Sequence, residues 1–538
     1  MPEKPEPKAR AAYRVLGKPT RRVDTAAKTD GSALFGIDAH PPGLRYAMVQ
    51  ASPVLGGALK NVGDAKALQV SGVRQVVSIG NAVVVVADTT WAAKKGLAAL
   101  QIAWDDGAIA ALATADMVAG ADAALEKTGL IAAKAGDVVA AETGAAAIHE
   151  MTFRLPMMAH AAMEPLNCTA HVTADRCEVW VGCQSLTRAK AIAAEVSGLP
   201  ADRVAVHNHL LGGGFGRRLE VDYVAQAVRI AKQVDGPVKV VWSREEDTRQ
   251  DYYRFHNHSR VTVALDAAGA PTSWRHRIVG PNIMARFLPV FQKDGVDLDI
   301  VGGANGPYDF PNLLIEFVRN EAPAGLNTGN WRGVGATRNV FIVESVIDAL
   351  ARRAGQDPIA YRRPLLRSQP RMLAALDLVA EKSGWGTPLP PRTARGVALC
   401  ADFASYVAMV AEAHVDEANE VTVKRIVATV DTGFAINPDI VKAQIEGGAI
   451  FGVSSALFDN VTVAKGRVEQ GNFDTNRVLR MNEAPPVEVY IIESGEDPGG
   501  VGEPGTAAAI AAVANAVSAV LGRQVAALPL DAERLKEA

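Results

Sequence analysis

The chain has few cysteines for its length, and they follow no redox or metal-binding pattern. Four cysteines are spread over 538 residues, with no CxxC pair and no iron–sulfur or zinc ligand spacing. We therefore expect buried free thiols, no disulfide scaffold and no metal ligated by the protein itself.

Strong charge, long apolar runs and a signal peptide are also missing. The net charge of −3 and the lack of a Lys/Arg run argue against a nucleic-acid partner. No apolar run is expected to reach the roughly 18–20 residues that span a bilayer, so direct membrane insertion is not predicted. Residues 1–22 lack the apolar centre of a secretory signal, so a cytoplasmic location and export through a partner's signal both stay open.

What is present is a globular composition in which strand-like and helix-like stretches alternate. A chain this long exceeds one hydrophobic core, so several domains are expected. One helix is predicted to be N-capped by Ser185 and closed by Gly198, and another to be N-capped by Thr90. The predicted divisions are a flexible lead-in (1–25), a compact α+β domain (26–107), an Ala/Gly-rich linker (108–150) and two larger regions (151–370 and 371–538).

A glycine-rich stretch, LLGGGFGRR at residues 210–218, lies between a predicted strand and a predicted helix. Glycines there would let backbone N–H groups approach an anion. The GxGxxG fingerprint fails, because Arg217 stands three residues after Gly214, and no GKS or GKT follows. Two interpretations remain: a tight turn around a core Phe215, or a loop that presses Phe215 against a bound group. An NAD-dependent aldehyde dehydrogenase is disfavoured, since Cys168 is its best and still unconvincing nucleophile.

Two charged residues are also framed by glycines. Arg332 lies in GNWRGVGATRN, where it is predicted either to face an anion or polarised oxygen or to pair with a structural carboxylate. Glu503 lies in PGGVGEPGT, directly before an alanine-rich stretch of helical composition. On pattern alone, Glu503 either caps that helix or serves as a functional base.

Eight stretches in order resemble the molybdopterin-binding subunit of the xanthine dehydrogenase / aldehyde oxidase family. The similarity is greatest to its isoquinoline 1-oxidoreductase β-subunit branch, and it covers nearly the whole chain. The stretches are MEPLNCTA, CQSLTRAKA, GGGFGRRLEVD, WSREED, NWRGVG, NPDIVKAQIEGG, MNEAPPVEV and GGVGEPGTAAAIAAVANA.

The resemblance implies an α+β fold and assigns roles to particular residues. Residues 26–107 would form an α/β-hammerhead domain, and 151–370 and 371–538 two molybdenum-cofactor domains. Gln184 would hydrogen-bond the apical ligand of molybdenum, Arg332 would face the substrate, and Glu503 would be the catalytic base. The implied cofactor-binding residues are Gly213, Gly214, Phe215, Gly216, Arg217, Gly333, Gly500 and Gly502.

The implied activity is oxidation of an aldehyde or N-heteroaromatic substrate. Glu503 would deprotonate a metal-bound hydroxyl, the inserted oxygen would derive from water, and hydride would pass to molybdenum. The implied cofactor is molybdopterin cytosine dinucleotide with molybdenum. Purine-oxidising members carry a glutamate four residues after the loop phenylalanine, where this chain has Leu219. A purine substrate is therefore not expected.

The family's GQG hairpin, which binds the pterin phosphates, has no match here. The single Gly-Gln pair, Gly355-Gln356, lies at a predicted helix end. We expect a separate polypeptide to supply this N-terminal segment, so that activity requires a heteromeric complex. A small 2Fe–2S subunit and a cytochrome c acceptor are the other implied partners. The alternative is an inactive or scaffold subunit, against which the retained Gln184, Phe215, Arg332 and Glu503 argue.

Overall fold

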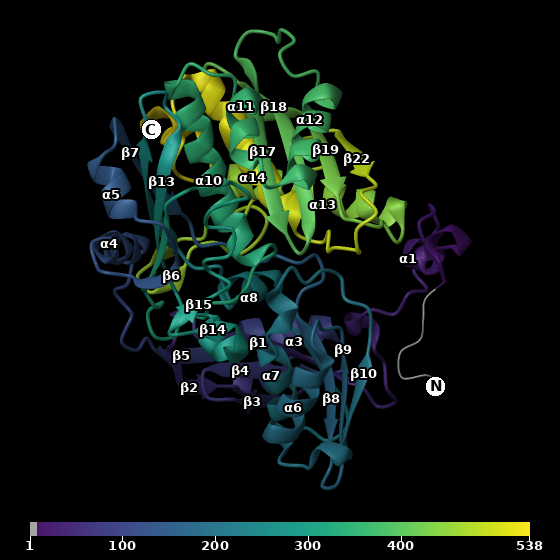
Figure 1. Cartoon of the computed structure of the whole chain (residues 1–538). Coiled ribbons are helices and arrows are strands. Elements are labelled where there is room, and N and C mark those ends of the chain that lie inside the picture. Colours follow the sequence, from purple (N-terminus) through teal and green to yellow (C-terminus); the bar gives the residue numbers. More distant parts are fainter. Residues whose placement is uncertain (1–7, 538) are drawn as a thin grey trace.

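The computed structural model describes residues 8–537, so residues 1–7 of the predicted lead-in lie outside the described part. Figure 1 shows the first half of the chain (purple to teal) forming the lower part of the molecule and its left flank, and the last third (green to yellow) forming the upper part. Three sheets of four or more strands organise these regions. The candidate site is built where loops from these parts meet.

The seven-stranded sheet of the lower part joins segments far apart in the sequence. Its order is β10-β9-β8-β11-β1-β4-β3, and β1 pairs in parallel with β11. The predicted 26–107 region therefore shares one sheet with residues beyond 151. The strands are β1 Arg45–Ala51, β3 Val73–Ser78, β4 Ala82–Ala87, β8 Asn167–Val172, β9 Cys177–Val181, β10 Val204–Asn208 and β11 Val238–Val241. Helices α3 Thr90–Ala99, α6 Leu186–Ser197 and α7 Asp222–Ala231 pack against it.

The five-stranded sheet includes much of the segment predicted as a linker. Its order is β6-β16-β13-β12-β7, and residues 108–150 supply β6, the first part of β7 and two helices. The strand LIAAKA (β6) has a single β-branched residue, so its state is set by pairing with β16 rather than by propensity. The elements are α4 Thr114–Ala124, β6 Leu130–Ala135, α5 Val138–Thr143, β7 Ala147–Leu155, β12 Asn257–Leu265, β13 Pro271–Gly280 and β16 Leu313–Arg319.

The four-stranded sheet of the upper part has the order β17-β18-β19-β22 and carries the largest hydrophobic core. α14 packs on β17 and β18, while α12 packs on β18 and β19, and α10 and α13 pack beside α14 (Figure 1). The elements are α10 Val334–Arg353, α12 Pro370–Ser383, β17 Thr393–Asp402, β18 Ser405–Val415, β19 Val421–Asp431, α13 Pro438–Phe458, β22 Val487–Ile492 and α14 Pro504–Leu521.

Helix α14 corrects the expectation that no apolar run is long enough for a membrane. Its 18 residues have a mean hydropathy of 1.6, which suffices for a span by length and composition, yet 83% of the helix is buried inside the protein. Small residues such as Ala507 and Ala511 let it pack tightly against its neighbours. The composition is thus accounted for by a core helix.

The predicted helix ends are confirmed in one case and shifted in the other. α6 begins after Ser185 and ends at Gly198, which has a φ of 80°, so both end positions are as predicted, although the Ser185 side chain makes no capping hydrogen bond. The cap of α3 is Thr89 rather than Thr90, because the Thr89 hydroxyl accepts a hydrogen bond from the Ala92 amide at 3.1 Å. The remaining elements of at least two residues, apart from short 3-10 turns, are α1 Thr25–Asp30, β2 Ala58–Gly63, α2 Ala65–Leu68, β5 Gln101–Asp105, α8 Arg244–Arg249, α9 Met284–Phe287, β14 Gln292–Lys293, β15 Val296–Asp297, α11 Pro358–Arg362, β20 Val463–Ala464, β21 Arg467–Val468 and α15 Ala532–Glu537.

Candidate active site

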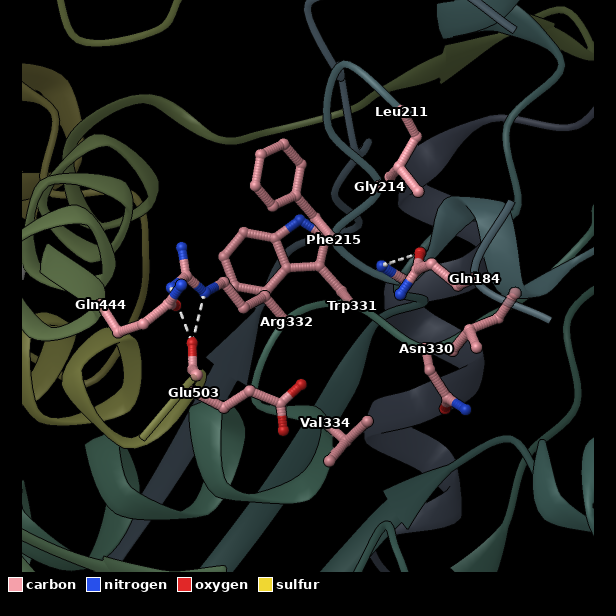
Figure 2. A pocket seen from close by; sticks show the side chains of 13 residues that line it. Gln184, Leu211, Gly214, Phe215, Asn330, Trp331, Arg332, Val334, Gln444 and Glu503 are labelled. Carbon is pink, nitrogen blue, oxygen red and sulfur yellow. Dashed lines mark hydrogen bonds between the residues drawn. The ribbon is translucent and has the colours of Figure 1, made fainter. Parts of the chain in front are cut away.

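A pocket of about 390 Å³ collects the residues that the sequence singled out (Figure 2). Gln184, Phe215, Arg332 and Glu503 come from distant parts of the chain and line the same cavity. The full lining is Gln184, Leu211, Gly214, Phe215, Gly216, Leu219, Asn330, Trp331, Arg332, Val334, Gln444, Gly502 and Glu503. Of the predicted cofactor-binding residues, those outside this lining are Gly213, Arg217, Gly333 and Gly500.

The glycine loop adopts a backbone that ordinary residues rarely take. Phe215 has a φ of 54° and Gly216 a φ of 115°. A Cβ on Gly216 would lie 1.8 Å from the Asn330 carbonyl oxygen, so the loop touches the 330–333 turn backbone to backbone. The Gly216 amide donates to Gln184 Oε1 at 3.2 Å (Figure 2). This bond orients the glutamine and leaves its amide nitrogen available to a ligand.

Arg217 was predicted to contact the cofactor, but its side chain lies behind the pocket. It is 2% exposed, with Nη1 2.7 Å from Asp222 and Nε 3.0 Å from Asp251. Asp251 also lies 3.0 Å from His160 Nδ1, and His160 Nε2 lies 2.8 Å from the Asn330 carbonyl oxygen. A buried network therefore holds the Asn330 carbonyl against the glycine loop. No sequence pattern indicated His160 or Asp251.

A second buried pair anchors the start of the same loop. Arg218 is fully buried, and its Nη2 lies 3.0 Å from Glu164 Oε2. The Gly212 amide donates to the same carboxylate oxygen at 2.7 Å. Glu164 belongs to the MEPLNCTA stretch, whose motif was recognised from the sequence without a role for its acid.

Arg332 lies beside the base and points at the backbone. Its Nε and Nη2 both donate to the Gly502 carbonyl, at 2.8 and 2.6 Å (Figure 2). Nη2 also lies 3.3 Å from Oε1 of Gln444, which sequence reasoning missed. Burial lowers the pKa of Arg332, and the charge of Glu503 opposes that shift.

Glu503 precedes α14, with Pro504 in the first turn, as expected for an acid at a helix start. Its side chain makes no capping hydrogen bond to that helix, which disfavours a purely capping role. Burial raises the pKa of the Glu503 carboxyl, while hydrogen bonding to the Gly333 backbone and the charge of Arg332 lower it. The carboxylate is therefore more basic than a free glutamate.

Apolar and aromatic side chains make up most of the remaining wall. Two of these lining rings, Phe215 and Trp331, are packed against Phe451 of α13, which is not itself in the lining (ring centroids 4.6 and 4.8 Å apart). Leu219 lines the pocket, whereas Glu220 turns away and pairs with Arg286 at 2.8 Å. The pocket therefore has an apolar side chain at position 219, and the neighbouring acid is directed out of it.

The residues present fit a group that brings its own metal ligands. Residues 8–537 hold no cluster of three or more His, Cys, Asp or Glu side chains suited to a metal ion. The pocket instead offers the glycine loop and the buried Oδ1 of Asn330, which has no hydrogen-bond partner within the described part of the chain. All four cysteines are buried and free, as predicted.

Two family models described as molybdopterin cofactor-binding domains match residues 124–364 and 361–485. The chain is 32% identical over 544 residues to the isoquinoline 1-oxidoreductase subunit beta of Brevundimonas diminuta, covering 97% of this chain and 69% of that protein. It is 29% identical over 548 residues to the membrane-bound aldehyde dehydrogenase (pyrroloquinoline-quinone) of Gluconacetobacter polyoxogenes, covering 95% and 71%.

Among solved structures, quinoline 2-oxidoreductase from Pseudomonas putida 86 superimposes with a TM-score of 0.80. The match covers 97% of this chain and 98% of that one at 14% sequence identity. At this identity the likeness shows the fold alone. It agrees with the predicted α+β class.

Proposed function

Because the chain belongs to the molybdopterin-binding family of xanthine dehydrogenases and aldehyde oxidases, we propose that it is the catalytic subunit of a molybdenum hydroxylase that oxidises an aldehyde or an N-heteroaromatic compound. It is a molybdenum-dependent oxidoreductase subunit, and its relatives are subunits of larger complexes. The observation that carries the proposal is the convergence of Gln184, Phe215, Arg332 and Glu503 on one pocket.

Glu503 is the proposed general base. It is the carboxylate that lines the pocket, and burial raises its pKa, which makes it a better proton acceptor than a free glutamate. Its carboxylate oxygens would take the proton from the attacking oxygen, which derives from water. The nearby Arg332 charge favours the ionised form of the base.

The glycine loop and Gln184 are the proposed cofactor cradle. Gly214 and Gly216 lack side chains where a Cβ would strike Gln184 Oε1 (2.5 Å) and the Asn330 carbonyl (1.8 Å). The Gly216 amide is already bonded to Gln184 Oε1, so the donors left for a ligand are the Gly214 amide and the Gln184 amide nitrogen, which need no rearrangement on binding. Molybdopterin with molybdenum, which we propose to be the cytosine dinucleotide form, supplies oxygen insertion and accepts the substrate hydride when bound.

The apolar lining supports an uncharged planar substrate. Leu211, Leu219 and Val334 border the pocket, and no charged side chain other than Arg332 and Glu503 lines it among the described residues. An aldehyde or an N-heteroaromatic ring fits such a cavity better than a purine, whose polar ring atoms need a polar side chain as hydrogen-bond partner. The names of the relatives, an isoquinoline oxidoreductase subunit and an aldehyde dehydrogenase, support the same two classes.

The proposed complex contains a small 2Fe–2S subunit and uses cytochrome c as its electron acceptor. Gln444 and Gly502 are exposed at the rim of the pocket. We further propose that residues 26–107, which hold β1 to β5, form the hammerhead domain.

The test is a comparison of the wild-type complex with its Glu503→Gln variant on a panel of aldehydes and N-heteroaromatics. We expect wild-type turnover of at least one class and a loss of about 10³-fold or more in kcat for the variant, with equal molybdenum content. A variant that keeps its turnover would refute the assignment of the base.

A scaffold subunit is the alternative function. It predicts that the assembled complex contains no molybdenum at this chain and oxidises none of the panel. Metal analysis of the complex distinguishes the two functions.

A further inference from the structure

The contacts of Arg332 are directed at the backbone that leads into Glu503. Two guanidinium nitrogens, Nε and Nη2, donate to the same Gly502 carbonyl at 2.8 and 2.6 Å. This carbonyl belongs to the peptide bond between Gly502 and Glu503. Two donors on one acceptor fix its direction more tightly than one, and Figure 2 shows the pair beside the Glu503 side chain.

Helix α13 holds the guanidinium from two further sides. Gln444 Oε1 lies 3.3 Å from Arg332 Nη2, and the Phe451 ring lies under the guanidinium carbon at 5.6 Å. Gln444 and Phe451 are seven residues apart, which places them on one face of the helix, two turns from each other. Phe451 is itself held in the stack between Phe215 and Trp331.

The segment before Glu503 needs such support. It contains Gly499, Gly500 and Gly502, which restrict the backbone little. The Glu503 side chain makes no capping bond to α14, so the carboxylate is oriented by the Gly333 backbone and by the segment that leads into it, and not by the helix. The Gly499 and Gly500 amides are bonded to Thr432 and Phe403 carbonyls, whereas the Gly502 carbonyl is held by Arg332.

We propose that Arg332 is a positioning residue, which clamps the Gly502 carbonyl and thereby aims the Glu503 carboxylate, and that Gln444 and Phe451 hold the clamp in place. The inference rests on the proposed function for its catalytic consequence. It differs from the role implied by the resemblance, in which this arginine faces the substrate, because two of its three nitrogens are committed to Gly502.

The two roles predict different behaviour across substrates. A clamp acts on the base, so its loss slows every substrate by a similar factor. A cation that stabilises charge on the substrate would instead change the dependence of rate on substituent electronics. A clamp also restrains residues 498–506 whether or not substrate or cofactor is present.

The experiment compares the wild-type complex with Arg332→Met, Arg332→Lys, Gln444→Ala and the matched control Lys442→Ala. Lys442 is exposed on the same helix and does not line the pocket. Amide hydrogen exchange is measured over residues 498–506, and kcat/KM over a series of para-substituted benzaldehydes and N-heteroaromatics. Unfolding curves of all variants confirm that each is folded.

For Arg332→Met we expect faster exchange in 498–506 and a loss of about 100-fold in kcat/KM, equal across the series. Gln444→Ala should act in the same direction by about 5-fold, because it removes one hydrogen bond. Arg332→Lys should restore part of the protection through one donor. The Lys442→Ala control should match the wild type in both measurements.

Unchanged exchange in Arg332→Met, combined with rate losses that vary with the substituent, would overturn the clamp in favour of direct action on substrate. If Arg332→Met exchanges faster but the wild-type complex oxidises no compound in the series, the clamp is supported and the proposed function is refuted. The exchange measurement thus separates the two conclusions.

Discussion

The two walls of the pocket are held by different forces. The glycine-loop wall (Gln184 and residues 211–219) is backed by buried ions, with Arg217 and Arg218 paired to Asp251 and Glu164 at 3.0 Å. The base wall (Arg332, Gln444, Gly502 and Glu503) is held by hydrogen bonds from one half-buried guanidinium to a carbonyl and an amide.

This difference suits the tasks proposed for the two walls. A buried ion loses its partner only at a large free-energy penalty, so the glycine-loop wall resists displacement. Hydrogen bonds near the solvent exchange with water at little net loss, so the base wall can adjust. The proposed cofactor surface is therefore rigid, whereas the proposed proton acceptor, Glu503, belongs to the more easily deformed base wall.

Removing the shared acid should break the rigid wall. Asp251→Asn replaces the charge shared by Arg217 Nε and His160 with a neutral amide, while Asp222 still pairs with Arg217. We therefore expect a loss of about 1.5–3 kcal/mol in the free energy of unfolding, the range for hydrogen bonds to charged groups. Chemical denaturation measures it. Glu503→Gln on the base wall should change stability by less than about 1 kcal/mol, since burial already disfavours its charge. Equal losses in both variants would remove the distinction between the walls.

The same substitution on each wall sharpens the comparison. Gly216→Ala should lower the free energy of unfolding by about 2–3 kcal/mol, because its Cβ would lie 1.8 Å from the Asn330 carbonyl at a φ of 115°. Gly502→Ala should stay within about 0.5 kcal/mol, since no atom lies within 4 Å of its added Cβ. Thermal unfolding of both variants checks the contrast, which fails if Gly502→Ala is the more damaging change.

A half-buried acid outside both walls, Glu246, should give a pH dependence of stability. Burial raises the pKa of Glu246, on α8, to about 8, with the Ala51 amide and Arg249 opposing. Because the folded pKa lies above the unfolded one, the free energy of unfolding should fall as pH rises from about 4.5 to 8. Glu246→Gln keeps an acceptor for the Ala51 amide and should remove about 1–2 kcal/mol of that fall. Parallel pH–stability curves for variant and wild type would contradict the assignment.

Most of the pocket was predictable because its residues lie in local patterns. Phe215, Arg332 and Glu503 are each framed by glycines, and order along the chain linked them to one family. The direction of the Arg217 side chain could not be predicted, because Asp251, one of its two partners, lies far from it along the sequence. Phe451 could not be identified from the sequence, because an aromatic residue in an apolar helix is usually part of the hydrophobic core.

In the fold, too, elements with local sequence signals were predictable, and elements that depend on distant partners were not. The helix with Ser185 and Gly198 at its ends was predicted because caps are local signals. β6, in the expected linker, becomes a strand through pairing with β16, more than 170 residues away. The composition of residues 130–135 does not indicate that they pair with β16.

By itself the sequence indicated the family, the α+β class and seven residues that line one pocket, since backbone freedom at glycine and charge at isolated positions are local properties. Tertiary structure decided which of those charges face the pocket. Arg217 was turned into a buried network and Arg332 toward the Gly502 carbonyl, because a guanidinium taken out of water must find acceptors, and only the folded chain determines which acceptors are near.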